Sequence, residues 1–267
     1  MARKTAESGE LRLRARHANF RPGTRRTILS KDIHNSNVPR VCAACEARHR
    51  GICGAMTPDE LVAMSKHSRQ SRFAPGEALL AESAESTTYA NIMRGVVKLS
   101  KMLSDGRQQL VGLQFAPDFL GRPFASESPV TAEAASTVEA CRFPRAALEN
   151  LILHNPDLER RLLEQTLKEL DEARDWMVTL GRKTASEKVA SFLFLIATHI
   201  DPLRSATMHK AAFDLPLTRS DIADFLGLTV ETVSRQLTRL RTDNIIEITN
   251  NRHVVVPDLD ALSDRMG

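Results

Sequence analysis

Three of the four cysteines lie close together, as Cys42, Cys45 and Cys53, and the fourth, Cys141, lies far downstream. The two residues between Cys42 and Cys45 allow both sulfurs to face one centre, and Cys53 can close a loop over it. In a reducing compartment, cysteines clustered in this way favour metal chemistry over disulfides. We therefore expect these thiols to ligate one inorganic group.

One CxxC pair, one nearby cysteine and one remote cysteine form a pattern familiar from cubane iron–sulfur sites. Structural zinc usually takes two cysteine pairs, or a cysteine pair with a histidine pair, and stays an alternative, as do four unrelated free thiols. A four-thiolate cluster carries a net negative charge that neighbouring basic residues could offset. The basic residues in this segment are Arg40, Arg48, His49 and Arg50.

The segment from Leu217 to Leu240 predicts two short helices with capping signals. Thr218 and Asp221 form a capping-box pattern at the start of the first helix. Gly227 can end that helix in a left-handed conformation, and Thr229 can cap the second helix. Each helix has an apolar face, made of Ile222, Ala223, Phe225 and Leu226, and of Val230, Val233, Leu237 and Leu240. The pattern is typical of a helix-turn-helix.

The second helix of such a motif lies in the major groove of DNA. Its outward face carries Glu231, Ser234 and Arg235 at helical spacing, and we expect these side chains to contact bases. An arginine can bind guanine O6 and N7 together, and a glutamate can accept from the amino group of cytosine or adenine. The candidate contacts to the DNA backbone are Thr232, Arg239 and Arg241.

Residues 245–248 and 253–256 are β-prone runs joined by an Asn-Asn turn, which predicts a winged helix-turn-helix, and residues 258–266 predict a closing helix. Residues 57–147 combine strand-like runs, such as 96–103, with repeated turn signals containing Pro, Gly and Asp. This region predicts a small antiparallel barrel or jelly roll.

Asn155 and Pro156 predict the start of a long helix. Along it, an apolar stripe recurs with heptad-like spacing at Leu163, Leu167, Leu170, Ala173, Met177 and Leu180. Such a stripe could belong to an ordinary core. Because it lies between a sensor-like barrel and a DNA-reading motif, we expect it to pair two subunits as a homodimer.

The composition is that of a globular protein, with 42% hydrophobic and 26% charged residues among 267. No apolar stretch is long enough to cross a membrane, and the N-terminus lacks the apolar core of a signal peptide, so we expect a cytoplasmic protein. Residues 1–40 carry a net charge of +7, and the other 27 Lys and Arg against 30 Asp and Glu leave −3. This basic tail is expected to be flexible, with a DNA-binding arm as the alternative.

Together these features predict an α+β fold. Its expected parts are a flexible basic tail (1–38), a sensor domain (39–150) made of a cysteine loop (39–56) and a β-jelly-roll (57–150), a dimerisation helix (151–182), and a winged helix-turn-helix DNA-binding domain (183–267).

From about residue 38 to the end, the chain resembles the Crp/Fnr superfamily of bacterial transcription regulators. The resemblance rests on the cysteine cluster, the reading trio of the second helix and the barrel motifs Pro75-Gly76-Glu77, Gly95-Val96-Val97 and Asp105-Gly106-Arg107. The cysteine spacing is similar to that of the Fnr branch, the anaerobic oxygen sensors, of the FnrL/FnrN type.

The resemblance implies that Cys42, Cys45, Cys53 and Cys141 ligate an oxygen-labile [4Fe-4S] cluster. Subunits bearing the cluster would dimerise through the long helix and bind a palindrome of the TTGAT-N4-ATCAA kind, with RNA polymerase as a partner. Oxygen would convert the cluster to [2Fe-2S], which would then be lost, and would return the protein to inactive monomers.

The chain departs from the cyclic-nucleotide branch of this superfamily. That branch holds ribose and phosphate with a Gly-Glu pair and a later Arg-Ser or Arg-Thr pair, but residues 121–123 and 128–131 lack the Glu and the later Arg. Without these charge-assisted contacts, no cyclic nucleotide is expected to bind. The barrel is then a scaffold.

The sequence contains no GxSxG, HExxH, GxxxxGK or GxGxxG motif, so we predict that the chain is not an enzyme. An electron carrier would use the same cysteines but would leave the helix-turn-helix unexplained. A Crp-like regulator with structural zinc, or with a small-ligand effector in the barrel, is the remaining alternative.

Overall fold

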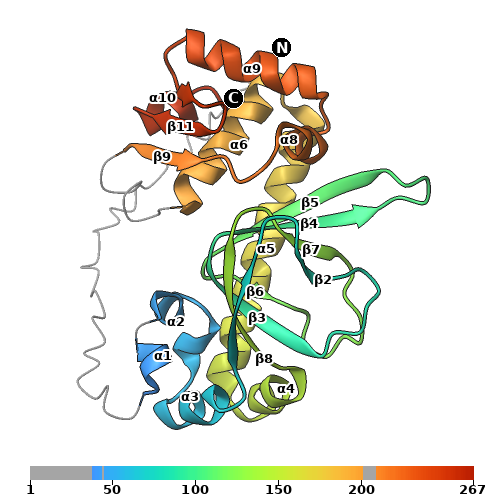
Figure 1. Ribbon diagram of the computed structural model, residues 1–267, viewed down its shortest axis with the longest axis vertical. Helices are drawn as coiled ribbons and strands as arrows, with labels where there is room; N and C mark the ends of the chain where they lie inside the picture. Colours follow the sequence, from blue (N-terminus) through green and yellow to red (C-terminus); the bar gives the residue numbers. More distant parts are fainter. Residues whose placement is uncertain (1–37, 44, 201–208) are drawn as a thin grey trace, which may run out of the picture. The chain divides into compact units, whose positions relative to one another are not determined.

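The computed structural model describes residues 38–43, 45–200 and 209–267 (Figure 1). The chain divides into a unit over Met1–Asn35 and a unit over Ser36–Gly267, and all the described elements belong to the second. The predicted flexible tail, with its alternative as a DNA-binding arm, falls almost entirely outside the described residues. None of the described helices is both long enough and apolar enough to cross a membrane.

Two four-stranded antiparallel sheets form a barrel (Figure 1). The strand order is β1-β8-β3-β6 in one sheet and β2-β7-β4-β5 in the other. The strands are β1 (Arg69–Phe73), β2 (Ala78–Leu80), β3 (Thr88–Arg94), β4 (Val96–Met102), β5 (Gln108–Phe115), β6 (Phe119–Leu120), β7 (Thr131–Ala134) and β8 (Val138–Pro144). Small and apolar side chains from both sheets fill the space between them. The sheet-rich domain predicted from the turn signals is confirmed.

Helices precede and follow the barrel. They are α1 (Arg40–Ala43), α2 (Glu46–Arg50), the 3₁₀-helix η2 (Ile52–Ala55), α3 (Pro58–Ser65), α4 (Arg145–His154) and α5 (Pro156–Arg182). Residues 57–150 were predicted as a jelly roll, and the helices α3 and α4 within this range were not predicted. A readable signal existed for α3, because Thr57 and Glu60 form a complete capping box and Pro58 occupies the first turn.

The segment predicted as one dimerisation helix, residues 151–182, contains the end of α4 as well as α5. The break is at Asn155, whose backbone is extended and whose side-chain oxygen accepts a hydrogen bond from the Leu158 amide at 2.9 Å. Pro156 then occupies the first helical position, where no amide donor is required. The predicted start of the long helix is therefore confirmed at Asn155 and Pro156.

The C-terminal region is a winged helix-turn-helix. Its elements are α6 (Ala185–Ile200), β9 (Ala211–Asp214), α8 (Arg219–Leu226), α9 (Val230–Thr242), β10 (Glu247–Thr249), β11 (His253–Val256) and α10 (Leu259–Ser263). Asn250 and Asn251 both have positive φ, as a tight hairpin turn between twisted strands requires. The predicted wing is confirmed, and β9 adds a third strand beside β11 that the sequence analysis did not predict.

Three hydrophobic clusters hold these elements together. One fills the barrel, one joins the cysteine loop to α3, α4 and the start of α5, and one joins the barrel to the helix-turn-helix. Ile52, Leu148 and Leu158 are fully buried in the second cluster. Each such side chain stabilises the folded state by about 1.5–3 kcal/mol relative to its exposed form. The cysteine loop is therefore anchored by apolar packing from elements distant in the sequence.

Candidate functional site

Short helices carry the first three cysteines. Cys42 lies in α1, Cys45 directly precedes α2 and Cys53 lies in η2. The cap position of α2, which Cys45 occupies, makes no side-chain hydrogen bond. At Gly51, a Cβ atom would come within 2.9 Å of the Pro117 carbonyl oxygen, so only glycine allows this close approach to the barrel. Tertiary packing, more than helix propensity, places this loop.

Cys141 lies on β8, in the interior of its sheet between β1 and β3. Its cross-strand partner on β3 is Asn91, a buried residue. The Asn91 side-chain amide donates a hydrogen bond to the Cys53 sulfur at 3.0 Å. Cys53 and Cys141 also pack against the same hydrophobic cluster. The strand β8, which carries Cys141, therefore lies next to the loop that carries the other three cysteines.

The thiols influence one another electrostatically. Burial, and after it negative charge on Cys141, Cys42 and Cys45, raises the pKa of Cys53 to about 12, although the Asn91 hydrogen bond acts in the opposite direction. Burial also raises the pKa of Cys141, with added contributions from Cys42 and Cys45. The four predicted ligand residues thus share one electrostatic environment.

Two neighbouring groups stabilise the thiolate forms. Burial and the Cys45 thiol raise the pKa of Cys42, but the buried Arg48 guanidinium lowers it. Burial raises the pKa of Cys141, and a hydrogen bond from Ser68 lowers it. Arg48 therefore has the position expected of a residue that offsets negative charge at the cysteines.

The cysteine site fits an iron–sulfur cluster by its donor chemistry. The loop and β8 bring four thiols near enough to influence one another's ionisation, and four thiolates are the ligand set of a [4Fe-4S] cluster. Deprotonating several buried neighbouring thiols is unfavourable, as the raised pKa values show, and binding to iron cations offsets this penalty. Among the described residues, no three or more His, Cys, Asp or Glu side chains are arranged to hold a single metal ion.

Hydrogen bonds connect the cysteine loop to the start of α5. The Asn155 side-chain amide donates hydrogen bonds to the Glu60 carboxylate at 2.8 Å and to the Ala55 backbone carbonyl at 3.3 Å. Arg161 donates from its guanidinium to the Arg50 carbonyl at 2.6 Å. Ala55 ends η2, the short helix that contains a cysteine, and Asn155 is the N-cap of α5. A change in the loop can therefore reach α5 directly.

The predicted dimer stripe lies on the surface of α5. Met177 is 71% exposed and Leu163 58% exposed, although both side chains are apolar. Of the other predicted members, Leu167, Leu170 and Ala173 are exposed and Leu180 is half-buried. An extended apolar stripe at the surface is typical of an interaction face.

Local capping interactions define the ends of the two helices of the helix-turn-helix. Thr218 and Asp221 form the complete capping box predicted at the start of α8. Gly227 ends this helix with φ 61° and ψ 43°, a left-handed conformation that disfavours side chains with a Cβ. Thr229 caps α9 by accepting a hydrogen bond from the Thr232 amide. The predicted apolar faces are buried except at Val230, which is 39% exposed because it lies in the first turn, outside the packed part of α9.

The outward face of α9 presents the predicted reading residues together. Glu231, Ser234 and Arg235 are all exposed on this helix. The Arg235 guanidinium donates to the Thr232 hydroxyl at 3.4 Å, which is a long and weak contact that DNA could replace. The predicted backbone contacts Arg239 and Arg241 are also exposed, and Thr232 is half-buried.

Arg219, the first residue of α8, was not predicted as a DNA contact. Its Nη2 donates to the Asn251 carbonyl in the wing turn at 3.1 Å. Its Nη1 is buried and has no hydrogen-bond partner, and burial lowers the pKa of the side chain. Because this Nη1 has almost no exposed surface, it is out of reach of DNA, and the Arg219 side chain instead links α8 to the wing turn.

The interior of the barrel is largely filled. A cavity lined by residues of β1, β2, β3, β6 and β8 has a volume of about 10 Å³, whereas small-molecule sites usually have about 300–1,000 Å³. Arg142, which lines it, donates to the Thr88 hydroxyl at 2.7 Å. This cavity has no room for a nucleotide.

Comparison with protein families matches two parts of the chain. Residues 70–155 match the cyclic nucleotide-binding domain, and residues 187–265 match the Crp-like helix-turn-helix domain. The first match covers the barrel strands and α4, and the second covers most of α6 and nearly all of the winged helix-turn-helix.

Similar proteins extend over most of the chain. A probable transcriptional activator from Rhizobium leguminosarum bv. viciae is 53% identical over 88% of this chain and 97% of that protein. The transcriptional activator protein FnrL from Cereibacter sphaeroides is 38% identical over 85% of this chain and 92% of that protein. The structure of FixK2 from Bradyrhizobium japonicum covers 75% of this chain and 98% of its own, with 32% identity and a TM-score of 0.66.

Proposed function

Because the chain belongs to the Crp/Fnr family of transcription regulators, we propose that it is an oxygen-responsive activator whose cysteine site controls its binding to DNA. Its relatives are named as transcriptional activators, in agreement with the prediction that the chain is not an enzyme. The observation that supports the oxygen-sensing part is the mutual electrostatic influence of the thiols of the loop and Cys141 on a distant strand.

Cys42, Cys45, Cys53 and Cys141 would hold a [4Fe-4S] cluster at the cysteine site. When bound, the cluster would supply the reactivity toward oxygen. The chain contributes the thiolate ligands and the surroundings that stabilise them, among which the buried Arg48 offsets negative charge. The Asn91 amide orients Cys53 by its hydrogen bond to the sulfur.

The cysteine loop acts on dimerisation through the first turns of α5. Occupied cysteines order the loop, and the loop holds Asn155 and Arg161 through backbone carbonyl groups. An ordered N-terminus of α5 favours the helix orientation in which the apolar stripe meets its symmetry mate. A differential stability of a few kcal/mol between the two loop states is enough to shift a monomer–dimer equilibrium.

The dimer then reads a palindrome of the TTGAT-N4-ATCAA kind. Arg235 binds a guanine through O6 and N7, while Glu231 and Ser234 complete the base contacts. Thr232, Arg239 and Arg241 contact the DNA backbone. Two half-sites bound at once give far higher affinity than one.

The remaining partners follow from this role. An activator acts with RNA polymerase in the cytoplasm, where the DNA is. The filled barrel and the missing phosphate-binding residues support a sensor that takes no cyclic nucleotide. The barrel then serves as the scaffold that places Cys141 and α5.

Purification without air tests the proposal. We expect a brown protein that contains iron and acid-labile sulfide and that shifts a palindromic duplex in a gel. Exposure to air should remove the colour and the shift together. A colourless protein that contains zinc and binds DNA equally well in air would overturn the oxygen-sensing proposal in favour of the structural-zinc regulator.

A further inference from the structure

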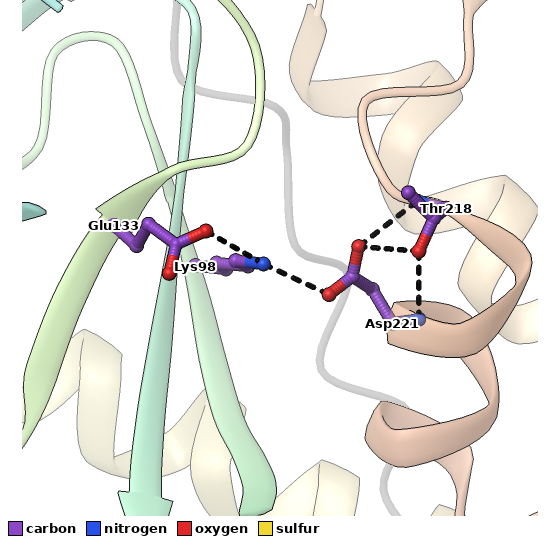
Figure 2. Close-up of polar contacts among 4 residues, drawn as sticks. All are labelled: Lys98, Glu133, Thr218 and Asp221. Carbon is purple, nitrogen blue, oxygen red and sulfur yellow. Dashed lines mark hydrogen bonds and ion pairs between the residues drawn. The ribbon is translucent and has the colours of Figure 1, made fainter. Parts of the chain in front are cut away.

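A lysine of the barrel reaches the helix-turn-helix. The Lys98 ammonium group on β4 lies 2.9 Å from the Glu133 carboxylate on β7 and 2.9 Å from the Asp221 carboxylate on α8. Figure 2 shows the ammonium group between these two carboxylates, with the barrel strands on one side and α8 on the other. Exposed fractions of 13% for Lys98 and 17% for Asp221 place this contact largely out of water.

Asp221 has two structural roles at once. One of its carboxylate oxygens accepts from the Thr218 amide at 3.1 Å and from the Thr218 hydroxyl at 2.6 Å, which completes the capping box of α8. The other oxygen accepts from Lys98 (Figure 2). Asp221, which completes the capping box of α8, is therefore also the residue of this helix that Lys98 of the barrel contacts.

A second polar contact lies further along the same helix. The Gln109 side-chain amide on β5 donates to the Asp224 carbonyl oxygen at 2.7 Å. The hairpin of β4 and β5 thus contacts α8 at two levels, once near its N-terminus and once near its middle. Two separated contacts restrict rotation of the helix as well as its distance from the barrel.

Apolar packing joins the same surfaces but is less directional. Leu110 and Phe115 of β5 belong to one hydrophobic cluster with α6, α8 and α9, and Trp176 of α5 lies 4.6 Å from Phe225 of α8 between ring centroids. Hydrophobic contact favours burial without selecting one orientation. The charged contact at Lys98 has the geometry that can select one.

The charge of Lys98 is maintained by its partners. Burial alone would lower the pKa of Lys98, but the hydrogen bonds to Asp221 and Glu133 raise it above its ordinary value. Removing the ammonium group would leave two partly buried carboxylates facing each other, an arrangement that disfavours the docked state. Loss of this one cation should therefore release α8 without unfolding it.

We propose that Lys98 is a positioning residue that fixes the DNA-reading helices relative to the sensor and thereby sets the half-site spacing that a dimer accepts. The inference rests on the proposed function, because it requires two subunits on one palindrome. Each added base pair moves a half-site by about 3.4 Å and rotates it by about 35°. A firmly docked α8, with α9 packed on it, cannot follow that shift, whereas a released one can.

The test measures binding of anaerobically purified full-length protein to duplexes with N4 and N5 spacers and to a single half-site. Lys98→Met should reduce the preference for N4 over N5 about tenfold, while affinity for the single half-site stays unchanged. Lys98→Arg, which keeps the cation between the carboxylates, should retain the preference. Lys101→Met removes an exposed lysine from the same strand and serves as the matched control.

Asp221→Asn breaks the same contact from the other side and decides the question if Lys98→Met does not fold. An unchanged N4 preference in a folded Lys98→Met or Asp221→Asn protein would overturn the inference and leave the proposed function standing. Equal losses on the single half-site and the palindrome would show a merely structural role and would also overturn it. Failure of the unaltered protein to bind the N4 duplex would instead refute the proposed function, and the inference with it.

Discussion

The helix-turn-helix and the cysteine site are built in opposite ways. In the first, Thr218, Gly227 and Thr229 define two helices by contacts within one turn, and the helices bury their apolar faces against each other. In the second, a loop with weakly capped helices meets Cys141 on a strand that lies far away in the sequence. The DNA-reading region is specified locally, and the cysteine site is specified by tertiary contacts.

The difference suits their separate tasks. A reading helix must keep its shape in every state, so local signals that act without help from the sensor are appropriate. Under the proposed function the cysteine loop must change its order, and segments held by few local interactions open at low free-energy cost. Burial opposes ionisation of Cys42, Cys53 and Cys141, so the proposed cluster would complete the site.

Cys141→Ser should produce the largest effect, because it breaks the sensing region alone. We expect loss of the bound iron and a fall of at least about 100-fold in anaerobic binding to the palindrome, since the dimer is lost. Thermal unfolding of the helix-turn-helix should not change. Gln70→Ala, which alters an exposed residue directly across from Cys141 on β1, is the control and should retain iron. Unchanged DNA binding by Cys141→Ser would remove that residue from the site.

Met177→Glu should abolish the dimer while leaving both the cysteine site and the helix-turn-helix intact within each subunit. The introduced charge cannot be buried in an apolar seam, so we expect monomers and a fall of about 100-fold in affinity for the palindrome. The iron content should remain intact. Lys168→Glu places the same side chain on the opposite side of α5, at a residue that is exposed, and should leave the dimer unchanged. A persistent Met177→Glu dimer by light scattering would contradict the seam.

Arg235→Ala should damage only the reading region. We expect a loss of about 1–3 kcal/mol in binding free energy on the cognate palindrome and little change on scrambled DNA, because a base contact is removed. Arg239→Ala should instead weaken both duplexes alike and reduce the salt dependence, as a phosphate contact does. If the Arg235 variant loses equal affinity on both duplexes, its side chain contacts the backbone.

Asn155→Ala should have the smallest effect, because it weakens only the link between the cysteine loop and α5. Loss of the N-cap costs about 1 kcal/mol, which corresponds to about a fivefold weaker dimer. The cluster should still assemble, so iron content is measured beside sedimentation. Asp258→Ala removes the N-cap of α10 at a similar cost, without touching the contacts of Asn155, and should leave dimerisation unchanged. Equal dimer loss in both variants would show a general effect of stability.

Elements specified by local signals could be predicted from the sequence, whereas several of those specified by tertiary contacts could not. The caps at Thr218 and Thr229, the left-handed end at Gly227 and the start of α5 at Asn155 were predicted, because each signal acts within four residues. The helices α3 and α4 were missed, since the turn signals around them were interpreted as parts of a barrel. The exposure of Val230 was also missed, because its helical spacing alone placed it on the buried face.

By itself, the sequence determined the types of side chain available for chemistry and the local elements that carry them. Only the tertiary structure decided that Asn91 donates to Cys53, that Asn155 connects the cysteine loop to α5, and that Lys98 reaches Asp221. Capping and helical periodicity act over one or two turns and can be read along the chain. Contacts between a loop and a strand, or between a barrel and a helix, depend on topology and register, which no local pattern encodes.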